Sequence, residues 1–183
     1  MIITISGHAG SGKSTVANLL AKKLRYKRYS VGDLRREMAQ KRRMTLEQYN
    51  KLGEKDKKTD TEADKWAKRL GETQNNFVID GRVAWHFIPH SFKVFLDVNQ
   101  KVAAQRSYKD HLAGKRTTEK ALHSLKEALQ EIKARQASDV KRYKKYYGIM
   151  YDSKKHFDFY YDTSNSAPAK AVAQILKAMK KKP

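Results

Sequence analysis

The first residues whose types and spacing predict chemistry are residues 7–15, which read Gly-His-Ala-Gly-Ser-Gly-Lys-Ser-Thr. They fit the phosphate-loop pattern, in which a glycine is followed by any four residues, then Gly-Lys, then Ser or Thr. Glycines let the backbone approach an anion closely, and the free N–H groups at the start of a helix bind phosphate oxygens. The pattern therefore predicts a site for a nucleotide polyphosphate.

The side chains of this phosphate loop have separate expected roles. Lys13 is expected to reach the β- and γ-phosphates of ATP, Ser14 to ligate Mg²⁺, and Thr15 to touch the α-phosphate. His8 is interpreted as an exposed loop residue. The expected nucleotide-binding set is Gly7, His8, Ala9, Gly10, Ser11, Gly12, Lys13, Ser14 and Thr15.

The segments on either side supply the context that a phosphate loop requires. Ile2, Ile3 and Ile5 form a β-branched run that is typical of a buried strand, and residues 16–24 repeat apolar side chains at helical spacing. A strand, a glycine-rich turn and a helix in this order favour a true phosphate loop over a chance match.

A second candidate site follows the next expected strand, residues 27–31. Ser30, Gly32 and Arg36 stand at the start of an expected helix, in a stretch rich in basic residues. Ligands of open α/β sheets gather beyond the carboxyl ends of strands, so this position predicts a pocket for a second phosphate. A solvated basic face is the alternative interpretation.

A third candidate site follows the apolar residues 77–79, which predict a buried strand. Asp80, Gly81 and Arg82 come directly after it. Asp80 is expected to hold Mg²⁺, usually through water, and Arg82 to bind phosphate oxygens with its planar fork of N–H donors. A tight turn that carries a surface arginine is the alternative.

Strands and helices alternate along the rest of the chain. Two polar helices, at about 46–54 and 57–71, carry few large apolar residues and predict a small lobe, in which Trp66 is interpreted as core packing. Further strands are expected at 94–98 and 157–162, and further helices at 99–110, at about 118–147 and from Pro168. This alternation predicts a five-stranded parallel sheet covered on both faces.

The long helix expected at 118–147 carries Arg135, Ser138 and Arg142 on one face, because seven residues span nearly two turns. A solvated face is the ordinary interpretation of such residues. Two arginines on one rigid helix could also close over a phosphoryl group in transfer. Lys13, Arg82, Arg135 and Arg142 are therefore the expected catalytic residues.

The composition is strongly basic, with 40 Lys and Arg against 19 Asp and Glu, a net charge of +21 and a pI of about 10.0. A field of this sign attracts phosphorylated small molecules and polyanions. The basic residues are spread along the chain and no nucleic-acid recognition motif is present, so RNA contact is a secondary expectation.

Other features of the composition narrow the class of protein. The absence of cysteine excludes a disulfide framework and a thiolate metal site. No apolar run approaches the roughly 20 residues of a membrane span. A length of 183 residues favours one domain, expected to be monomeric and cytoplasmic.

The chain resembles the nucleoside monophosphate kinases, and is most similar to the archaeal-type cytidylate kinase family. The resemblance extends over nearly the whole chain. Beyond the phosphate loop, its marks are Ser30-x-Gly32-Asp33 with Arg36, Asp80-Gly81-Arg82 with Trp85, and Arg135-x-x-Ser138-x-x-x-Arg142-Tyr143 leading to Tyr147-Gly148-Ile149. Met150 stands where the family often has an acid, and Asp152 follows two residues later.

The resemblance implies a P-loop NTPase three-layer α/β sandwich. It implies a core of residues 1–30, 76–110 and 156–180, a helical monophosphate-binding lobe at about 31–75, and a helical lid within about 111–147. It implies ATP with Mg²⁺ as donor and CMP or dCMP as acceptor. Arg36 and Arg82 would hold the acceptor phosphate, Arg135 and Arg142 would be lid arginines, and Arg106 is a further candidate.

Three functions remain open from the sequence. The first is phosphorylation of CMP or dCMP, with a substrate-binding set of Ser30, Gly32, Arg36, Asp80, Gly81 and Arg82. The second is an adenylate kinase or another small-molecule kinase on the same fold. The third is a nucleotide-dependent protein that associates with RNA through its basic surface.

Overall fold

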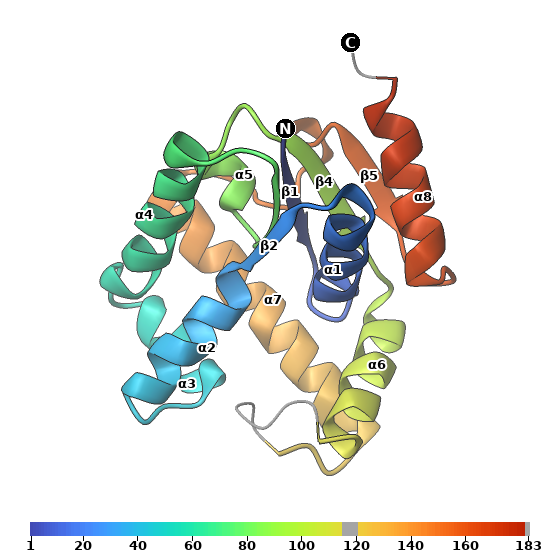
Figure 1. Cartoon of the computed structure of the whole chain (residues 1–183). Coiled ribbons are helices and arrows are strands. Elements are labelled where there is room, and N and C mark those ends of the chain that lie inside the picture. Colours follow the sequence, from blue (N-terminus) through green and yellow to red (C-terminus); the bar gives the residue numbers. More distant parts are fainter. Residues whose placement is uncertain (115–120, 182–183) are drawn as a thin grey trace.

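A five-stranded parallel sheet runs through the centre of the computed structural model, which describes residues 1–114 and 121–181 (Figure 1). The strand order is β2-β3-β1-β4-β5. The strands are β1 (Ile2–Gly7), β2 (Lys27–Ser30), β3 (Phe77–Asp80), β4 (Phe92–Asp97) and β5 (Phe159–Asp162). The predicted five-stranded parallel α/β sheet is confirmed.

β1 lies at the centre of the sheet, where all six of its residues are buried and it pairs with β3 and β4. Ile3 and Ile5 pack against α1 (Lys13–Leu24) and α8 (Pro168–Met179). Ile2 faces the opposite way, toward α4 (Lys58–Thr73) and α5 (Ala84–Phe87). Side chains alternate across a strand, so this one segment holds together two helical layers and the sheet between them.

Three helices at one side of the sheet form a unit with its own small core. They are α2 (Val31–Lys41), α3 (Leu46–Gly53) and α4, and Met38, Ala39 and Tyr49 pack among them. The starts of α2 and α3 follow local capping chemistry. The Ser30 hydroxyl accepts from Asp33 N–H, and Thr45 forms a capping box with Gln48.

The other side is built by α6 (Gln100–Leu112) and α7 (Leu125–Tyr147), which crosses behind the sheet edge toward α3 and α4 (Figure 1). Asn99 caps α6, since its side chain accepts from Lys101 N–H. A short 3-10 turn, Lys154–His156, precedes β5. None of the described helices is long and apolar enough to cross a membrane.

Several predicted boundaries are wrong by a few residues. The helix expected from 118 begins at Leu125, because the Ser124 hydroxyl caps it by accepting from Glu127 N–H. Residues 118–120 of that prediction lie outside the described residues. The fifth strand begins at Phe159 rather than 157, and the four-residue helix α5 was not predicted.

The interpretation of Trp66 as core packing is confirmed. Its ring meets Tyr29 edge-on, with the centroids 5.9 Å apart, and it packs against the apolar cluster between the sheet and α4.

Candidate active site

The carboxyl ends of the parallel strands meet at one edge of the sheet, and a cavity of about 380 Å³ lies there. The register places Asp80 beside Ser30 on one flank and beside Ile5 of β1 on the other. The cavity walls come from the phosphate loop, α2, α3, α6, α7, the turn after β3 and the segment before α8.

Most predicted site residues line this cavity. They are Ala9, Gly10, Ser11, Gly12, Lys13, Ser14, Thr15, Gly32, Arg36, Asp80, Gly81, Arg82, Arg135 and Arg142. Gly7, His8 and Ser30 do not line it and act on it through neighbours. The structure therefore brings segments from 7–15, 31–36, 80–82 and 135–142 to one place.

The phosphate loop is packed too tightly for side chains at two of its glycines. A Cβ at Gly7, where φ is +144°, would lie 2.1 Å from the carbonyl oxygen of Leu96. A Cβ at Gly10, where φ is +75°, would lie 2.7 Å from the Cβ of Ala103 on α6. β4 and α6 thus fix the loop from behind, and glycine is the residue that fits.

The start of α1 opens into the cavity without a side-chain cap. Gly12 is its N-cap residue, and the first turn contains no acidic residue. Backbone N–H groups at such a helix start and the helix dipole together favour an anion. This is the geometry that the phosphate-loop pattern predicts.

Lys13 is partly buried at the base of the loop. Its Nζ donates to the carbonyl oxygens of Gly7 at 2.9 Å and of His8 at 2.6 Å. Burial, with the positive charges of Arg82 and Arg135, holds the pKa of Lys13 well below its usual value. A bound phosphate would offset these effects, so Lys13 carries charge that an anionic ligand stabilises.

The interpretation of His8 as an exposed loop residue is wrong. Its side chain is 17% exposed. Nδ1 lies 2.8 Å from Asp97 Oδ1, and Nε2 lies 3.4 Å from Asp152 Oδ2 and 3.2 Å from Gln136 Nε2. His8 thereby connects the phosphate loop to the end of β4, to α7 and to the segment after α7.

Asp80 is buried where β2 and β3 end. Its Oδ2 accepts from the hydroxyls of Ser14 and Ser30, both at 3.1 Å. Arg28 pairs with Oδ1, with its Nε at 2.9 Å and Nη2 at 2.7 Å. Ser30, which is predicted to bind substrate, donates its hydroxyl to this carboxylate.

The Ser14 hydroxyl and the Asp80 carboxylate form an oxygen pair beside Lys13, which is a donor set that suits Mg²⁺. No group of three or more His, Cys, Asp or Glu side chains that could hold a metal ion occurs among the described residues. Mg²⁺ is commonly bound by one or two protein oxygens together with substrate phosphates, and the pair fits that mode.

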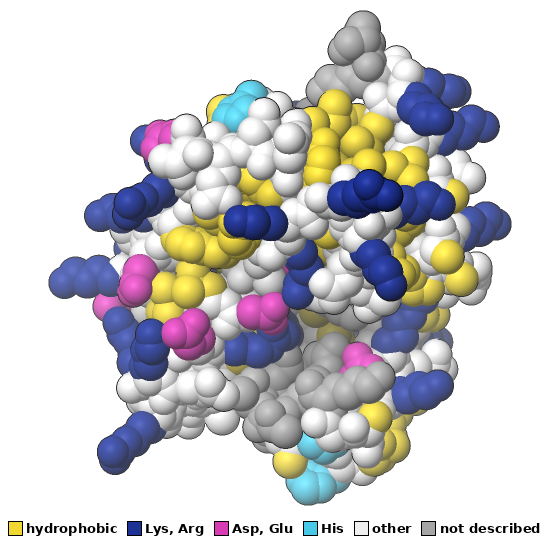
Figure 2. All heavy atoms as spheres, in the orientation of Figure 1, with side chains coloured by type: hydrophobic (Ala, Val, Ile, Leu, Met, Phe, Trp, Pro, Cys, Tyr) yellow, Lys and Arg dark blue, Asp and Glu magenta, His cyan; other side chains and the backbone are white. Residues whose placement is uncertain are grey.

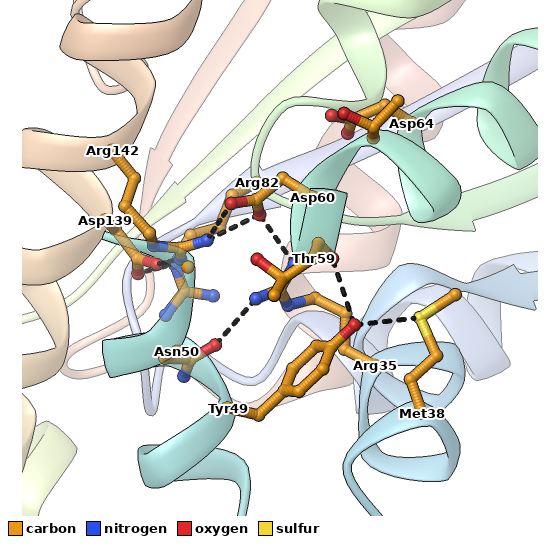
Figure 3. Close-up of polar contacts among 12 residues, drawn as sticks. Arg35, Met38, Tyr49, Asn50, Thr59, Asp60, Asp64, Arg82, Asp139 and Arg142 are labelled. Atoms are coloured by element: carbon orange, nitrogen blue, oxygen red, sulfur yellow. Dashed lines mark hydrogen bonds and ion pairs between the residues drawn. The ribbon is translucent and has the colours of Figure 1, made fainter. Parts of the chain in front are cut away.

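Five charged residues, four of them buried and Arg82 12% exposed, form an ion-pair cluster beside the phosphate loop, and all but Asp60 line the cavity (Figure 3). This buried ion-pair cluster consists of Arg35, Asp60, Arg82, Asp139 and Arg142. Arg142 Nη1 lies 2.5 and 2.7 Å from the two oxygens of Asp60, and its Nη2 lies 2.7 Å from Asp139. Arg35 Nη1 donates to Asp60 at 2.6 Å, and Arg82 pairs with Asp139 through Nε.

The ordinary interpretation of Arg142 as part of a solvated face is wrong, because its side chain is 1% exposed. The surface-arginine alternative for Arg82 is wrong for the same reason, since it is 12% exposed. Burial opposes both charges, but Asp139 outweighs it for Arg82 and raises the pKa of that guanidinium. Burial also opposes the charge of Asp139, yet Arg82 and Arg142 lower its pKa, so the pair is ionised.

Arg82 is fixed at the turn after β3 through its backbone. Its carbonyl oxygen accepts from Ser6 Oγ at 2.6 Å and from Trp85 Nε1 at 3.1 Å. Its Nη2 is buried and has no hydrogen-bond partner among the described residues. A buried donor of this kind at a cavity wall fits an anionic ligand.

Three further arginines line the cavity. Arg36 has a side chain 32% exposed and pairs with Asp33 at 2.9 Å. Arg106 donates to the carbonyl oxygens of Gly10 at 3.3 Å and Thr163 at 2.7 Å. Arg135 is half-buried on α7 and faces the cavity.

Sequence reasoning missed Arg35, Asn50, Asp60 and Asp139. Asp139 had a visible signal, since it lies four residues after Arg135 and three before Arg142 on the same helical face. Asp60 had none, because it reaches Arg142 only through the packing of two helices that lie 82 residues apart in the chain.

The sequence matches one family along most of its length. A profile of the Cytidylate kinase-like family matches residues 2–165. The chain belongs to the cytidylate kinase-like family. It is 32% identical over 181 residues to the cytidylate kinase of Halobacterium salinarum, covering 98% of this chain and 89% of that one. It is 34% identical over 177 residues to the cytidylate kinase of Methanocella arvoryzae, covering 96% and 94%.

Two solved structures have folds similar to that of this chain. An uncharacterized protein from Eubacterium ventriosum aligns with a TM-score of 0.71 at 20% identity, covering 98% of each chain. Shikimate kinase from Bacteroides thetaiotaomicron aligns with a TM-score of 0.65 at 13% identity, again covering 98% of each chain. The fold is thus that of P-loop kinases, as expected from the sequence.

Proposed function

We propose that the protein transfers the γ-phosphoryl group of ATP to CMP or dCMP. The observation that supports this proposal is the cavity itself, which has a volume of about 380 Å³. Its lining includes the open start of α1, Lys13 and several arginines. Such a cavity has positive groups for two phosphorylated ligands. Membership of the cytidylate kinase-like family supports cytidine as the acceptor nucleoside.

The chemistry requires positioning more than proton transfer. A nucleotide phosphate has a second pKa of about 6, so the acceptor is already an oxyanion at neutral pH and needs no general base. The protein must align two anions and stabilise charge as the phosphoryl group moves. Lys13 and the cavity arginines are the residues that can do so.

The residue roles follow the position of each group in the cavity. Residues 7–15 would hold the donor phosphates. Arg36 and Arg82, with Gly32 and Gly81 nearby, would hold the acceptor phosphate, and Arg135 and Arg142 would neutralise the group in transfer. Ser14 and Asp80 would hold Mg²⁺, which supplies further positive charge at the donor phosphates.

The segment roles extend the same proposal. Residues 31–75 would bind the acceptor as a lobe, and residues within 111–147 would act as a lid that excludes water from the donor. We place the enzyme in the cytoplasm as a monomer. RNA contact remains an alternative, and Lys and Arg side chains do spread over most of the face in Figure 2.

The test is ADP formation from ATP and Mg²⁺ with CMP, dCMP, UMP, AMP, GMP or dTMP as acceptor. Strong stimulation by CMP or dCMP alone is the expected result. Stimulation by AMP instead would move the activity to adenylate kinase. Binding of ATP without stimulation by any acceptor, together with salt-sensitive RNA retention in an Arg36→Ala, Arg82→Ala double variant, would favour the RNA-associated alternative.

A further inference from the structure

A second cavity of about 220 Å³ lies between α3 and α7, next to the phosphate cavity. Leu46, Asn50 and Arg135 line both cavities, so the two share a wall. The other lining residues are Glu47, Lys51, Glu54, Glu131, Ala134 and Ser138. A ligand whose phosphate lies at Arg36 and Arg82 has this cavity beside it for the rest of the molecule.

The second cavity is acidic in a strongly basic protein. Basic residues outnumber acidic ones by 40 to 19 in the chain, yet among the described residues three glutamates and two basic residues line this space. Glu54 is fixed by Lys141, whose Nζ lies 2.9 Å from Oε2, and Lys141 with Ser138 lowers the pKa of the Glu54 carboxyl. Glu131, which is half-buried on α7, lines the same cavity. Phosphate is therefore an unsuitable occupant, and a group with N–H donors is suitable.

Asn50 adds a donor to the same cavity. Its Oδ1 accepts from Arg35 Nη2 at 3.0 Å, and Figure 3 shows its side chain turned toward Arg35. A guanidinium has no acceptor, so this bond fixes which end of the amide is oxygen. The Nδ2 group is left as the donor, in a residue that lines both cavities.

The size of the cavity suits one aromatic ring. A cavity of about 150 Å³ accommodates a benzene ring in a protein interior. A volume of about 220 Å³ leaves room for a six-membered ring with its exocyclic groups, walled by the apolar Leu46 and Ala134.

We propose that this cavity holds the base of the acceptor and selects cytosine over uracil. Glu131, supported by Glu54, accepts from the exocyclic amine, and Asn50 Nδ2 donates to the ring carbonyl. Carboxylates are the side chains that read the cytosine amine elsewhere. Uracil presents a carbonyl oxygen at the same position, which two carboxylates repel. The inference rests on the proposed function, since it assumes a pyrimidine nucleotide acceptor.

The test compares kcat/KM for CMP and for UMP at saturating ATP in Glu131→Gln and Glu54→Gln. A glutamine keeps the size of the side chain, loses the charge and can donate to the uracil carbonyl. We expect kcat/KM for CMP to fall about tenfold or more in Glu131→Gln, mainly through KM. The kcat/KM for UMP in the same variant is expected to stay unchanged or to rise. Glu37→Gln is the matched control, because Glu37 pairs with Lys41 on the exposed face of α2 and lines neither cavity.

The outcomes separate this inference from the proposed function. An unchanged CMP to UMP ratio in both variants, with an active wild type, would overturn the base cavity and leave the kinase intact. A wild type that prefers AMP would also overturn it. If the wild type transfers to no acceptor, calorimetric binding of CMP decides. Equal affinity in wild type and Glu131→Gln overturns the inference, and a tenfold loss supports it.

Discussion

Two groups of cations face each other across the active-site cavity, and they are held in different ways. Arg35, Arg82 and Arg142 are paired with the buried carboxylates of Asp60 and Asp139. Lys13 and Arg106 are held by backbone carbonyl oxygens, which carry no net charge.

The difference separates two tasks that positive charge performs. A carboxylate partner makes a buried guanidinium tolerable and fixes its direction, so the first group contributes to the stability and shape of the cavity. A carbonyl partner orients the cation and leaves its charge for the ligand. Loss of a cation from the first group should therefore destabilise the fold as well as impair transfer, whereas loss of one from the second group should affect folding less.

The largest expected effect is that of Lys13→Ala on phosphoryl transfer. Removing the cation at the donor phosphates should lower kcat about 10⁴-fold, as for other groups that neutralise charge in phosphoryl transfer. The free energy of unfolding should stay the same or rise, because Lys13 is partly buried and forms no ion pair with a carboxylate of the described residues. Transfer assays and chemical denaturation measure the two effects. Turnover near that of the wild type would remove Lys13 from the mechanism.

The reverse pattern is expected for Asp60→Asn. This change leaves Arg142 and Arg35 with buried charge and one carboxylate fewer, so the free energy of unfolding should fall by about 3–5 kcal/mol. Denaturant titration measures it. Glu37→Gln breaks an exposed pair with Lys41 and should cost less than about 0.5 kcal/mol. A similar decrease in the free energy of unfolding in the two variants would show that the buried ion-pair cluster stabilises the fold no more than an exposed ion pair does.

Asp64 is a third kind of buried carboxylate in the same region. Its hydrogen-bond donor is a hydroxyl group rather than an arginine. Tyr147 donates to it, and burial raises the pKa of Asp64 to about 7. In the unfolded chain the pKa is about 3.9, so protonation favours the fold. This contribution is complete below about pH 4 and is lost as the pH rises through 7.

Asp64→Asn should therefore remove a pH dependence of unfolding on the order of 2 kcal/mol between pH 5 and pH 8. The variant should match or exceed the wild type at pH 8. Denaturation at a series of pH values measures this. A wild-type stability that rises over the same interval in parallel with the variant would contradict the assignment to Asp64.

The smallest expected effect is that of Arg36→Ala. Arg36 is partly exposed and pairs with the exposed Asp33, so the free energy of unfolding should change by less than about 0.5 kcal/mol. The KM for the acceptor should rise about tenfold, because one phosphate contact is lost. The KM for ATP serves as the internal control. An acceptor KM that stays constant would assign Arg36 to the surface rather than to the substrate.

The parts of the site that sequence predicted are those specified by neighbouring residues. Residues 7–15 carry their whole chemistry in one loop between a strand and a helix. Arg36 and Asp80 were found because the ends of parallel strands meet at one edge. The capping pair Ser124 and Glu127 was equally local, and overlooking it placed the start of α7 too early.

The parts that sequence did not predict depend on packing between distant helices. The burial of Arg142 requires α4 to supply Asp60, and the position of His8 requires Asp97 and Asp152 from two other segments. Nothing in the residues near Arg142 or His8 specifies these partners. A charge on a helical face therefore indicates a site only after the neighbouring helix is known.

The inward placement of acidic side chains changes how the molecule meets its ionic surroundings. Asp60, Asp64, Asp80 and Asp139 are all buried, in a chain with only 19 acidic residues. Because these negative charges are buried, the outer surface is more positive than the composition alone suggests. Solvent anions therefore gather at that surface. A polyphosphate must displace those anions to enter, and mobile ions screen its attraction over about 10 Å at 0.1 M salt. Nucleotide capture should consequently weaken as the salt concentration rises, even though no catalytic contact has changed.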